Sequence, residues 1–158
     1  MNSKDVTIIT IVGKQNAGKT TLLGDLIPKL KEHGYTVGTL KYNIRKFDID
    51  HDGKDTYKYY HSGADSVALS SQNKVAVIKK TARPLTLHEI IDTHLNDVSI
   101  VLVEGYREGD YPRIRITDSL EVESDNELLL IKENPETGRF SEKDINRALD
   151  FIKNILKK

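Results

Sequence analysis

The chain has 158 residues, with 24 lysine and arginine residues balanced by 24 aspartate and glutamate residues, and it has no cysteine. This length suits one well-buried core, so a single domain spanning residues 1–158 is predicted. The balanced charge provides no global field for nucleic acid or an anionic membrane, and the missing cysteines exclude disulfides and thiolate metal sites. Because the sequence contains no signal peptide and no apolar run of about 20 residues, we expect a cytoplasmic protein.

The first predicted element is a strand that leads into a glycine-containing loop. Residues 6–12 are β-branched almost throughout, which is typical of a strand, and they run directly into residues 13–20. Leucine and isoleucine residues then repeat at helical spacing as far as Gly34, a typical C-terminal cap. Strand, loop and helix in this order are what a phosphate-binding loop requires.

Strand and helix signals alternate along the rest of the chain. Further apolar or alternating runs predict strands at 36–40, 67–70, 75–78, 100–103, 113–117 and 128–131. Helices are predicted at 53–62, from 86 toward 94, and from the N-cap Ser141 to the end of the chain. This alternation predicts an α/β fold of the P-loop NTPase type, with a mostly parallel sheet and helices on both faces. The ligand is expected at the carboxyl ends of the strands.

Residues 13–20, GKQNAGKT, fit the phosphate-binding pattern GxxxxGK[ST] at every fixed position. The loop amides are expected to point at phosphate oxygens, the lysine to reach the β- and γ-phosphates, and the threonine hydroxyl to ligate Mg²⁺. The expected nucleotide contacts in this loop are Gly13, Asn16, Ala17, Gly18, Lys19, Thr20 and Thr21. Lys14 is interpreted as an ordinary exposed lysine, and the trans-acting lysine of dimeric deviant Walker ATPases is the alternative.

Glu104 stands where a Walker B acid is expected, directly after the apolar run 100–103 and before Gly105. The usual residue there is aspartate, and the longer glutamate is expected to reach Mg²⁺, directly or through water, or to position an attacking water. Glu104 is therefore predicted as both a metal and a catalytic residue. The alternative is a solvated acid at the end of a strand.

The densest group of acids lies within residues 48–65, between two predicted strands, which is the position of a switch region. Candidates there for an Mg²⁺ contact or a γ-phosphate sensor are Asp48, Asp50, Asp52, Lys54, Asp55 and Thr56. The alternative is a charged surface loop that leads into a helix. The histidines include no i, i+4 pair, which disfavours a zinc site, and Ala76 replaces the aspartate of a guanine-reading NKxD motif that begins at Asn73.

Several of these segments, in this order, resemble the MobB family of molybdopterin guanine dinucleotide biosynthesis. The segments are GKQNAGKTTLL, LIPKLKEHGYTVGTLK, FDIDHDGKDTYKYYHSGA, VLVEGYR and PRIRI. The P-loop is shared by many unrelated proteins, whereas GKDTY followed by SGA, and later VEGYR, is specific to this kind of protein. The resemblance implies a homodimeric accessory protein that binds GTP and Mg²⁺, assists a molybdopterin guanylyltransferase, and hydrolyses GTP slowly. Molybdopterin is a further ligand that it suggests.

The resemblance also adds candidate residues outside the P-loop. By it, Asp50 and Asp55 become candidate catalytic residues, and Lys41 and Lys54 become candidate nucleotide contacts. Relatives commonly carry a histidine-rich stretch after the lysine at position 41, where this chain has YNIRK at residues 42–46. Functions tied to those histidines are therefore not expected here.

A P-loop kinase for nucleotides or small molecules is the main alternative. Such a kinase needs an arginine-rich lid over the phosphates. The clustered arginines past the P-loop are Arg107, Arg113 and Arg115, and the last two are expected on one strand face rather than in a lid. A metallochaperone GTPase also suits the fold, but the sequence lacks the histidine and cysteine ligands that it would need.

Overall fold

The computed structural model describes residues 6–42, 44, 47–117, 127–131 and 139–157. The chain divides into two compact units. The first comprises residues 1–43 and 87–158, and the second comprises residues 44–86, which lie between them in the sequence. Each unit contains a sheet of its own.

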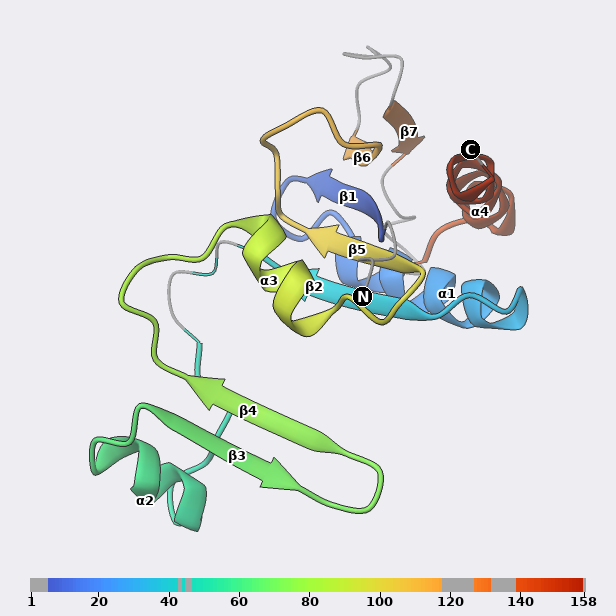
Figure 1. Ribbon diagram of the computed structural model, residues 1–158. Coiled ribbons are helices and arrows are strands. Elements are labelled where there is room, and N and C mark those ends of the chain that lie inside the picture. The colour runs from blue at the N-terminus through green and yellow to red at the C-terminus, as the bar shows by residue number, and fades with distance from the viewer. Residues whose placement is uncertain (1–5, 43, 45–46, 118–126, 132–138, 158) are drawn as a thin grey trace. The chain divides into compact units, whose positions relative to one another are not determined.

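The first unit contains a five-stranded sheet in which all neighbouring strands are parallel (Figure 1). Its strands are β1 (Thr7–Gly13), β2 (Val37–Lys41), β5 (Ile100–Glu104), β6 (Arg113–Thr117) and β7 (Glu127–Ile131). The spatial order is β2-β5-β1-β6-β7, so the chain moves to one side of β1 and later to the other. In open α/β sheets, ligands bind at the carboxyl end of the strand where the order reverses, which here is β1.

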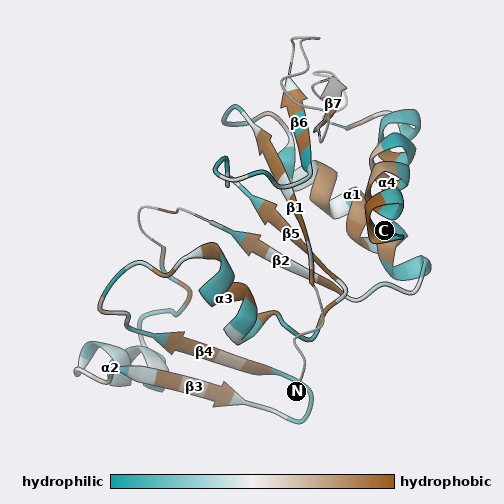
Figure 2. Cartoon of the chain, turned by 45° about the horizontal axis from the view of Figure 1, so that its top comes forward, coloured by the Kyte–Doolittle hydropathy of each residue, from teal (hydrophilic) through white to brown (hydrophobic). Residues whose placement is uncertain are grey.

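Helices cover both faces of this sheet: α1 (Lys19–Glu32), α3 (Leu87–His94) and α4 (Glu142–Leu156). On one face, Ile9 and Ile11 of β1 join a core cluster that includes residues of α1 and α4. On the other, Val101 and Val103 of β5 cluster with apolar residues of α3. Figure 2 shows the corresponding hydrophobic colouring along β1 and β5 and both hydrophobic and hydrophilic residues on α4. The predicted α/β fold with a parallel sheet between two helical layers is confirmed.

The helix ends follow the signals in the sequence. After α1, Gly34 adopts a φ of 84°, and the N–H of Tyr35 bonds to the carbonyl of Leu30 at 3.2 Å, as in a Schellman cap. At the start of α4, the side chain of Ser141 accepts a bond from the N–H of Asp144 at 3.1 Å. Both predicted caps are confirmed, which explains why the helix boundaries could be predicted closely.

The second unit contains α2 (Asp55–His61) and an antiparallel hairpin of β3 (Ser66–Ser70) and β4 (Val75–Lys79). The N–H of Ser71 bonds to the carbonyl of Lys74 at 2.8 Å and closes the hairpin turn. The predicted helix and strand pair are therefore present. The hairpin forms a separate two-stranded sheet rather than part of the parallel one.

None of the helices within the described residues is both long and apolar enough to cross a bilayer.

Candidate nucleotide site

The GKQNAGKT segment forms a tight loop between β1 and α1. Gly18 has a φ of 87°, which favours glycine, and Asn16 adopts a φ of 57°. Asn16 is the one residue other than glycine with a positive φ among the described residues. The first turn of α1 begins at Lys19, and the N–H groups of a first helical turn have no intrahelical acceptor. They are available to an anion, and the positive end of the helix dipole favours negative charge there.

Gly13 is required by close packing rather than by its backbone angle. A Cβ atom at this position would lie 2.9 Å from the carbonyl oxygen of Ile116 and 3.4 Å from the Cβ of Ala17. The Cα partner of Gly13 in the neighbouring strand β6 is also Ile116. The start of the loop is therefore packed against β6 so closely that any side chain would displace the backbone.

The side chain of Lys19 folds back over the loop. Its Nζ donates to the carbonyl of Lys14 at 2.7 Å and to that of Gly13 at 3.3 Å. These bonds hold the ammonium group against the loop backbone. Lys14 is exposed, and only its backbone carbonyl, not its side chain, takes part in the hydrogen bond with Lys19. Thr20 is also exposed.

Glu104 and Lys41 lie together at the carboxyl edge of the sheet. Glu104 is the Cα partner of both Ile11 in β1 and Lys41 in β2. Lys41 Nζ lies 4.0 Å from Glu104 Oε1, and the side chains are 63% and 14% exposed, respectively. The structure thus brings together two strand-end residues that the sequence singled out separately, on the strand edge where β1 enters the P-loop.

The loop after β5 is anchored by aromatic side chains. The rings of Tyr42 and Tyr106 meet edge to face at 5.1 Å, and those of Tyr106 and Tyr111 at 5.8 Å. The hydroxyl of Tyr111 is 2.7 Å from Nε2 of His88 on α3. Desolvation, followed by the nearby charges of Tyr111, Glu108 and Tyr42, raises the pKa of Tyr106 above 10.0. This support was not predicted from the sequence, although the tyrosines around VEGYR are its visible signal.

The candidate residues Asp50, Lys54 and Asp55 belong to the second unit. Asp55 opens α2 and forms an exposed ion pair with Lys58 at 3.9 Å, and Lys54 is the N-cap of that helix. One carboxylate oxygen of Asp50, Oδ1, accepts from the N–H of His51 at 2.9 Å. Its Oδ2 is buried without a hydrogen-bond partner among the described residues. A buried acceptor without a partner is costly and is often associated with a functional role.

No group of three or more histidine, cysteine, aspartate or glutamate side chains gathers as a metal cluster within the described ranges. Mg²⁺ in nucleotide sites is usually bound by one or two protein oxygens together with phosphates and water, so such a cluster is not needed there.

Arg113 and Arg115 lie on β6, as predicted from the alternating RIRIT pattern.

Comparison with known proteins gives consistent matches. A family described as "Molybdopterin guanine dinucleotide synthesis protein B" matches residues 8–139. The molybdopterin-guanine dinucleotide biosynthesis adapter protein of Haemophilus influenzae is 32% identical over 117 residues, covering 72% of this chain and 64% of that protein. A crystal structure of molybdopterin-guanine biosynthesis protein B is similar with a TM-score of 0.62 at 26% identity, covering 96% of this chain and 99% of that chain.

The crystal structure of Bacillus subtilis MobB has a TM-score of 0.70 at 23% identity, covering 94% of this chain and 96% of that chain, and shows the same fold. In sequence, the chain spans less than two thirds of the length of its curated relatives, namely 64% and 66% of the first two.

Proposed function

Because the chain belongs to the molybdopterin guanine dinucleotide synthesis protein B (MobB) family, we propose that it is a cytoplasmic GTP-binding accessory protein of molybdenum cofactor biosynthesis. The observation that carries this proposal is the P-loop at the carboxyl end of β1, with Glu104 at the same strand edge. This arrangement places an acid close to a phosphate-binding loop. The relatives of the chain are named for molybdopterin-guanine dinucleotide biosynthesis.

In this proposal the P-loop binds the nucleotide phosphates through the amides of residues 13–21. Lys19 leaves the carbonyls of Gly13 and Lys14 and bonds to the β- and γ-phosphates instead. Thr20 ligates Mg²⁺, and Glu104 contacts the metal either directly or through a water molecule. Lys41 holds Glu104 in place and adds positive charge beside the phosphates.

Asp50, Lys54 and Asp55, which belong to the second unit, are further functional residues in this proposal. Asp50 and Asp55 act on Mg²⁺ or the attacking water, and Lys54 contacts the nucleotide. The buried, unpartnered oxygen of Asp50 supports this assignment, because a metal or a polarised water would supply the missing interaction. Hydrolysis is weak in this proposal, since an accessory protein needs to hold the nucleotide rather than turn it over.

A thermal-shift panel with GTP, GDP and ATP, each with and without Mg²⁺, tests nucleotide binding. A ligand at about 100 times its dissociation constant stabilises the native state by roughly 2.7 kcal/mol. At about 2–4 °C per kcal/mol, the guanine nucleotides should raise the melting temperature by roughly 5–10 °C. The Lys19→Ala variant is the control and should lose most of this shift. No shift with any nucleotide would overturn the proposal, and a shift with ATP alone would favour the kinase.

The strand location of two arginines also disfavours the kinase. A lid that closes over phosphates must move, whereas Arg113 and Arg115 lie in β6, which pairs with both β1 and β7. Arg107 alone of this group lies in a loop.

We also propose that the protein is a homodimer and that the hairpin supplies part of the interface. Val75 and Val77 are 67% and 54% exposed, and they share the face of the hairpin opposite the buried Val67. Within the described residues β3 and β4 pair only with each other, so each keeps an open edge. Light scattering should show a dimer that Val77→Lys weakens and that Lys74→Met, a change in the hairpin turn, leaves unaffected. A monomeric wild-type protein would refute this.

The proposed partner is a molybdopterin guanylyltransferase, with molybdopterin as the substrate that the pair handles. Association should depend on nucleotide, because the strand edge that holds Glu104 and the loop of residues 105–112 adjoin the P-loop strand. A titration of the purified transferase with and without GTP and Mg²⁺ is the test. If the two proteins do not associate under any of these conditions, the proposed partner is wrong, although nucleotide binding could still hold.

A further inference from the structure

A cavity of about 340 Å³ lies beside the P-loop, and positively charged residues dominate its lining. Its charged residues are Lys14, Arg107, Arg113 and Arg115, and Val12 and Ile116 contribute apolar surface. Among the residues that the structure describes, no aspartate or glutamate lines the cavity. All of these residues belong to the first unit of the chain. The volume is at the lower end of the range for small-molecule sites, about 300–1,000 Å³.

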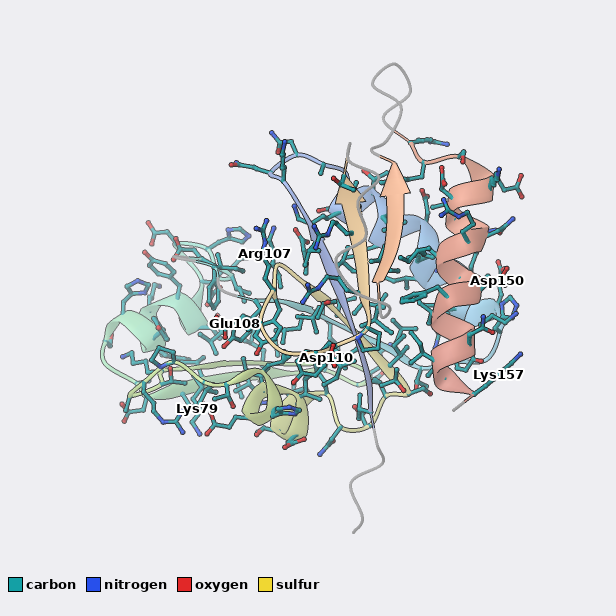
Figure 3. All side chains as sticks on the ribbon, turned by 90° about the horizontal axis from the view of Figure 1, so that it is seen from above. Lys79, Arg107, Glu108, Asp110, Asp150 and Lys157 are labelled. Carbon is teal, nitrogen blue, oxygen red and sulfur yellow. The ribbon has the colours of Figure 1, made fainter. Side chains whose placement is uncertain are left out.

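The connection from β5 to β6, which contributes Arg107 to the cavity, contains no helix. These strands are parallel and lie on either side of β1, and such crossovers usually contain a dozen or more residues with a helix that covers the sheet. Here only residues 105–112 make the connection, and Figure 3 labels Arg107, Glu108 and Asp110 along it. Next to this loop, β6 contributes two arginine side chains to the cavity, Arg113 and Arg115.

Arg113 is held in place by backbone carbonyls of the loop that precedes it. Its guanidinium donates to the carbonyl of Arg107 at 3.0 Å and to that of Gly109 at 3.4 Å. Its Nε is buried without a hydrogen-bond partner among the described residues. Neither Arg107 nor Arg113 forms an ion pair with a carboxylate in that part of the chain. Within the described residues these guanidinium groups have no carboxylate partner, and a positive charge in this position favours an external anion.

The cavity adjoins the P-loop, but its described lining does not include the residues expected to bind the β- and γ-phosphates and Mg²⁺. It includes Gly13 and Lys14 but neither Lys19 nor Thr20. Arg113 pairs with Thr10, which places it roughly 10 Å from Gly13 along the strands at about 3.3 Å per residue. An anion on Arg113 and one on Lys19 can therefore be bound together.

We propose that this cavity binds the phosphate monoester group of a small organic ligand while the P-loop holds a nucleotide. Guanidinium groups match phosphate oxygens in paired hydrogen bonds, so Arg107 and Arg113 are the expected anchors. The apolar surface of Val12 and Ile116 suits the carbon skeleton of the ligand. This inference rests on the proposed function only in assigning the nucleotide to the P-loop.

Isothermal titration of glycerol 3-phosphate into the full chain, preloaded with saturating GDP and Mg²⁺, tests the proposal. One equivalent should bind, and glycerol should not bind. Arg107→Met and Arg113→Met should each weaken binding roughly tenfold or more, as expected for loss of a charge-assisted hydrogen bond. Arg147→Met is the matched control, because Arg147 lies on α4 outside the cavity and pairs with Asp144 at 3.1 Å. Arg107 is exposed, so its variant tests the site even where Arg113→Met fails to fold.

The Lys19→Ala variant separates this proposal from the previous one. Glycerol 3-phosphate should still bind this variant without nucleotide, because Lys19 does not line the cavity. If no guanine nucleotide binds the wild-type protein but glycerol 3-phosphate does, the proposed function fails and the cavity proposal stands. Loss of phosphate binding in Lys19→Ala, unchanged binding in both arginine variants, or tighter binding of a short polyaspartate peptide would overturn the cavity proposal.

Discussion

Lys41 and Glu104 are direct partners at the carboxyl edge of the parallel sheet: their Cα atoms are paired between β2 and β5, and Lys41 Nζ lies 4.0 Å from Glu104 Oε1. Lys41 is mostly exposed and Glu104 mostly shielded. A pair with one exposed partner contributes little to folding, at most about 1 kcal/mol. Its more important effect is on orientation, since the lysine restrains a carboxylate that stands beside the P-loop strand.

Glu104→Gln should leave nucleotide affinity nearly unchanged and reduce Mg²⁺-dependent GTP hydrolysis. The substitution keeps the size of the side chain but removes the charge, and the loss of a metal's outer partner typically lowers activity by roughly 10- to 100-fold. Isothermal titration measures the first effect and phosphate release the second. Lys41→Met is the companion variant and should have a smaller effect in the same direction. Unchanged hydrolysis in Glu104→Gln would identify Glu104 as a simple strand-end acid.

Lys19→Ala should preserve the fold and weaken GTP binding far more than Lys14→Ala does. Lys19 Nζ bonds to two loop carbonyls, so it already lies at the loop that is expected to bind the phosphates. The loss of a bond between an ammonium and a phosphate is worth roughly 1.5–3 kcal/mol, or about tenfold or more in affinity. Isothermal titration of the two variants compares them. Equal losses would instead support a trans-acting role for Lys14.

Gly13→Ala and Gly24→Ala should change stability in opposite directions. At position 13 the new Cβ would meet the backbone oxygen of Ile116 at 2.9 Å, so the variant should lose about 1–3 kcal/mol. Gly24 lies in α1, where a Cβ would have no neighbouring atom within 4 Å, and alanine there should add about 0.5–1 kcal/mol. Chemical denaturation measures both. A Gly13→Ala protein as stable as the wild type would show that the loop and β6 can separate without cost.

The elements that local patterns encode were predictable. The cap at Gly34, the N-cap Ser141 and the alternation in RIRIT each act within a few residues, and the structure confirms all three. The P-loop was equally readable, because its chemistry needs fixed residue types at fixed spacing.

Long-range pairing was not predictable in the same way. The spacing of apolar residues does not indicate whether β2 pairs with β5 or with β1. The pairing of β2 with β5 is what brings Lys41 next to Glu104. The strand pair of β3 and β4 was predicted from its local turn, but not that it forms a sheet of its own. The cavity combines side chains from β1, the P-loop, β6 and the helix-free connection 105–112, and local sequence patterns do not show which of these segments meet.

Stability should fall above pH 10 in part through Tyr106. Desolvation first, and then the charges of Tyr111, Glu108 and Tyr42, raise the pKa of Tyr106 above its unfolded value of 10.0. The folded protein then binds the proton more tightly than the unfolded chain, so this contribution is complete below pH 10 and is lost as the pH rises through the folded pKa. Denaturation at pH 8 to 11 should show a smaller decline for Tyr106→Phe. A decline identical to that of the wild-type protein would contradict the raised pKa.

Asp50→Asn should separate function from stability at the second group of candidate residues. Asp50 Oδ2 is buried without a partner among the described residues, while Oδ1 accepts from the N–H of His51 at 2.9 Å. Asparagine keeps an oxygen for that bond and places an amide N–H₂ where the unpartnered oxygen was, so the free energy of unfolding should stay level within about 1 kcal/mol. If the carboxylate serves Mg²⁺ or the attacking water, GTP hydrolysis should fall in the same variant.

Asp150→Asn is the control for this experiment, because Asp150 is an exposed acid on α4 and is not among the candidate site residues. It should change neither stability nor hydrolysis. Denaturation and phosphate release on the two variants distinguish the possibilities. Lower stability in Asp50→Asn would mean that its carboxylate has a stabilising partner, and level or higher stability with unchanged hydrolysis would remove Asp50 from the proposed site. Only a stable variant with impaired hydrolysis fits a carboxylate retained for its chemistry.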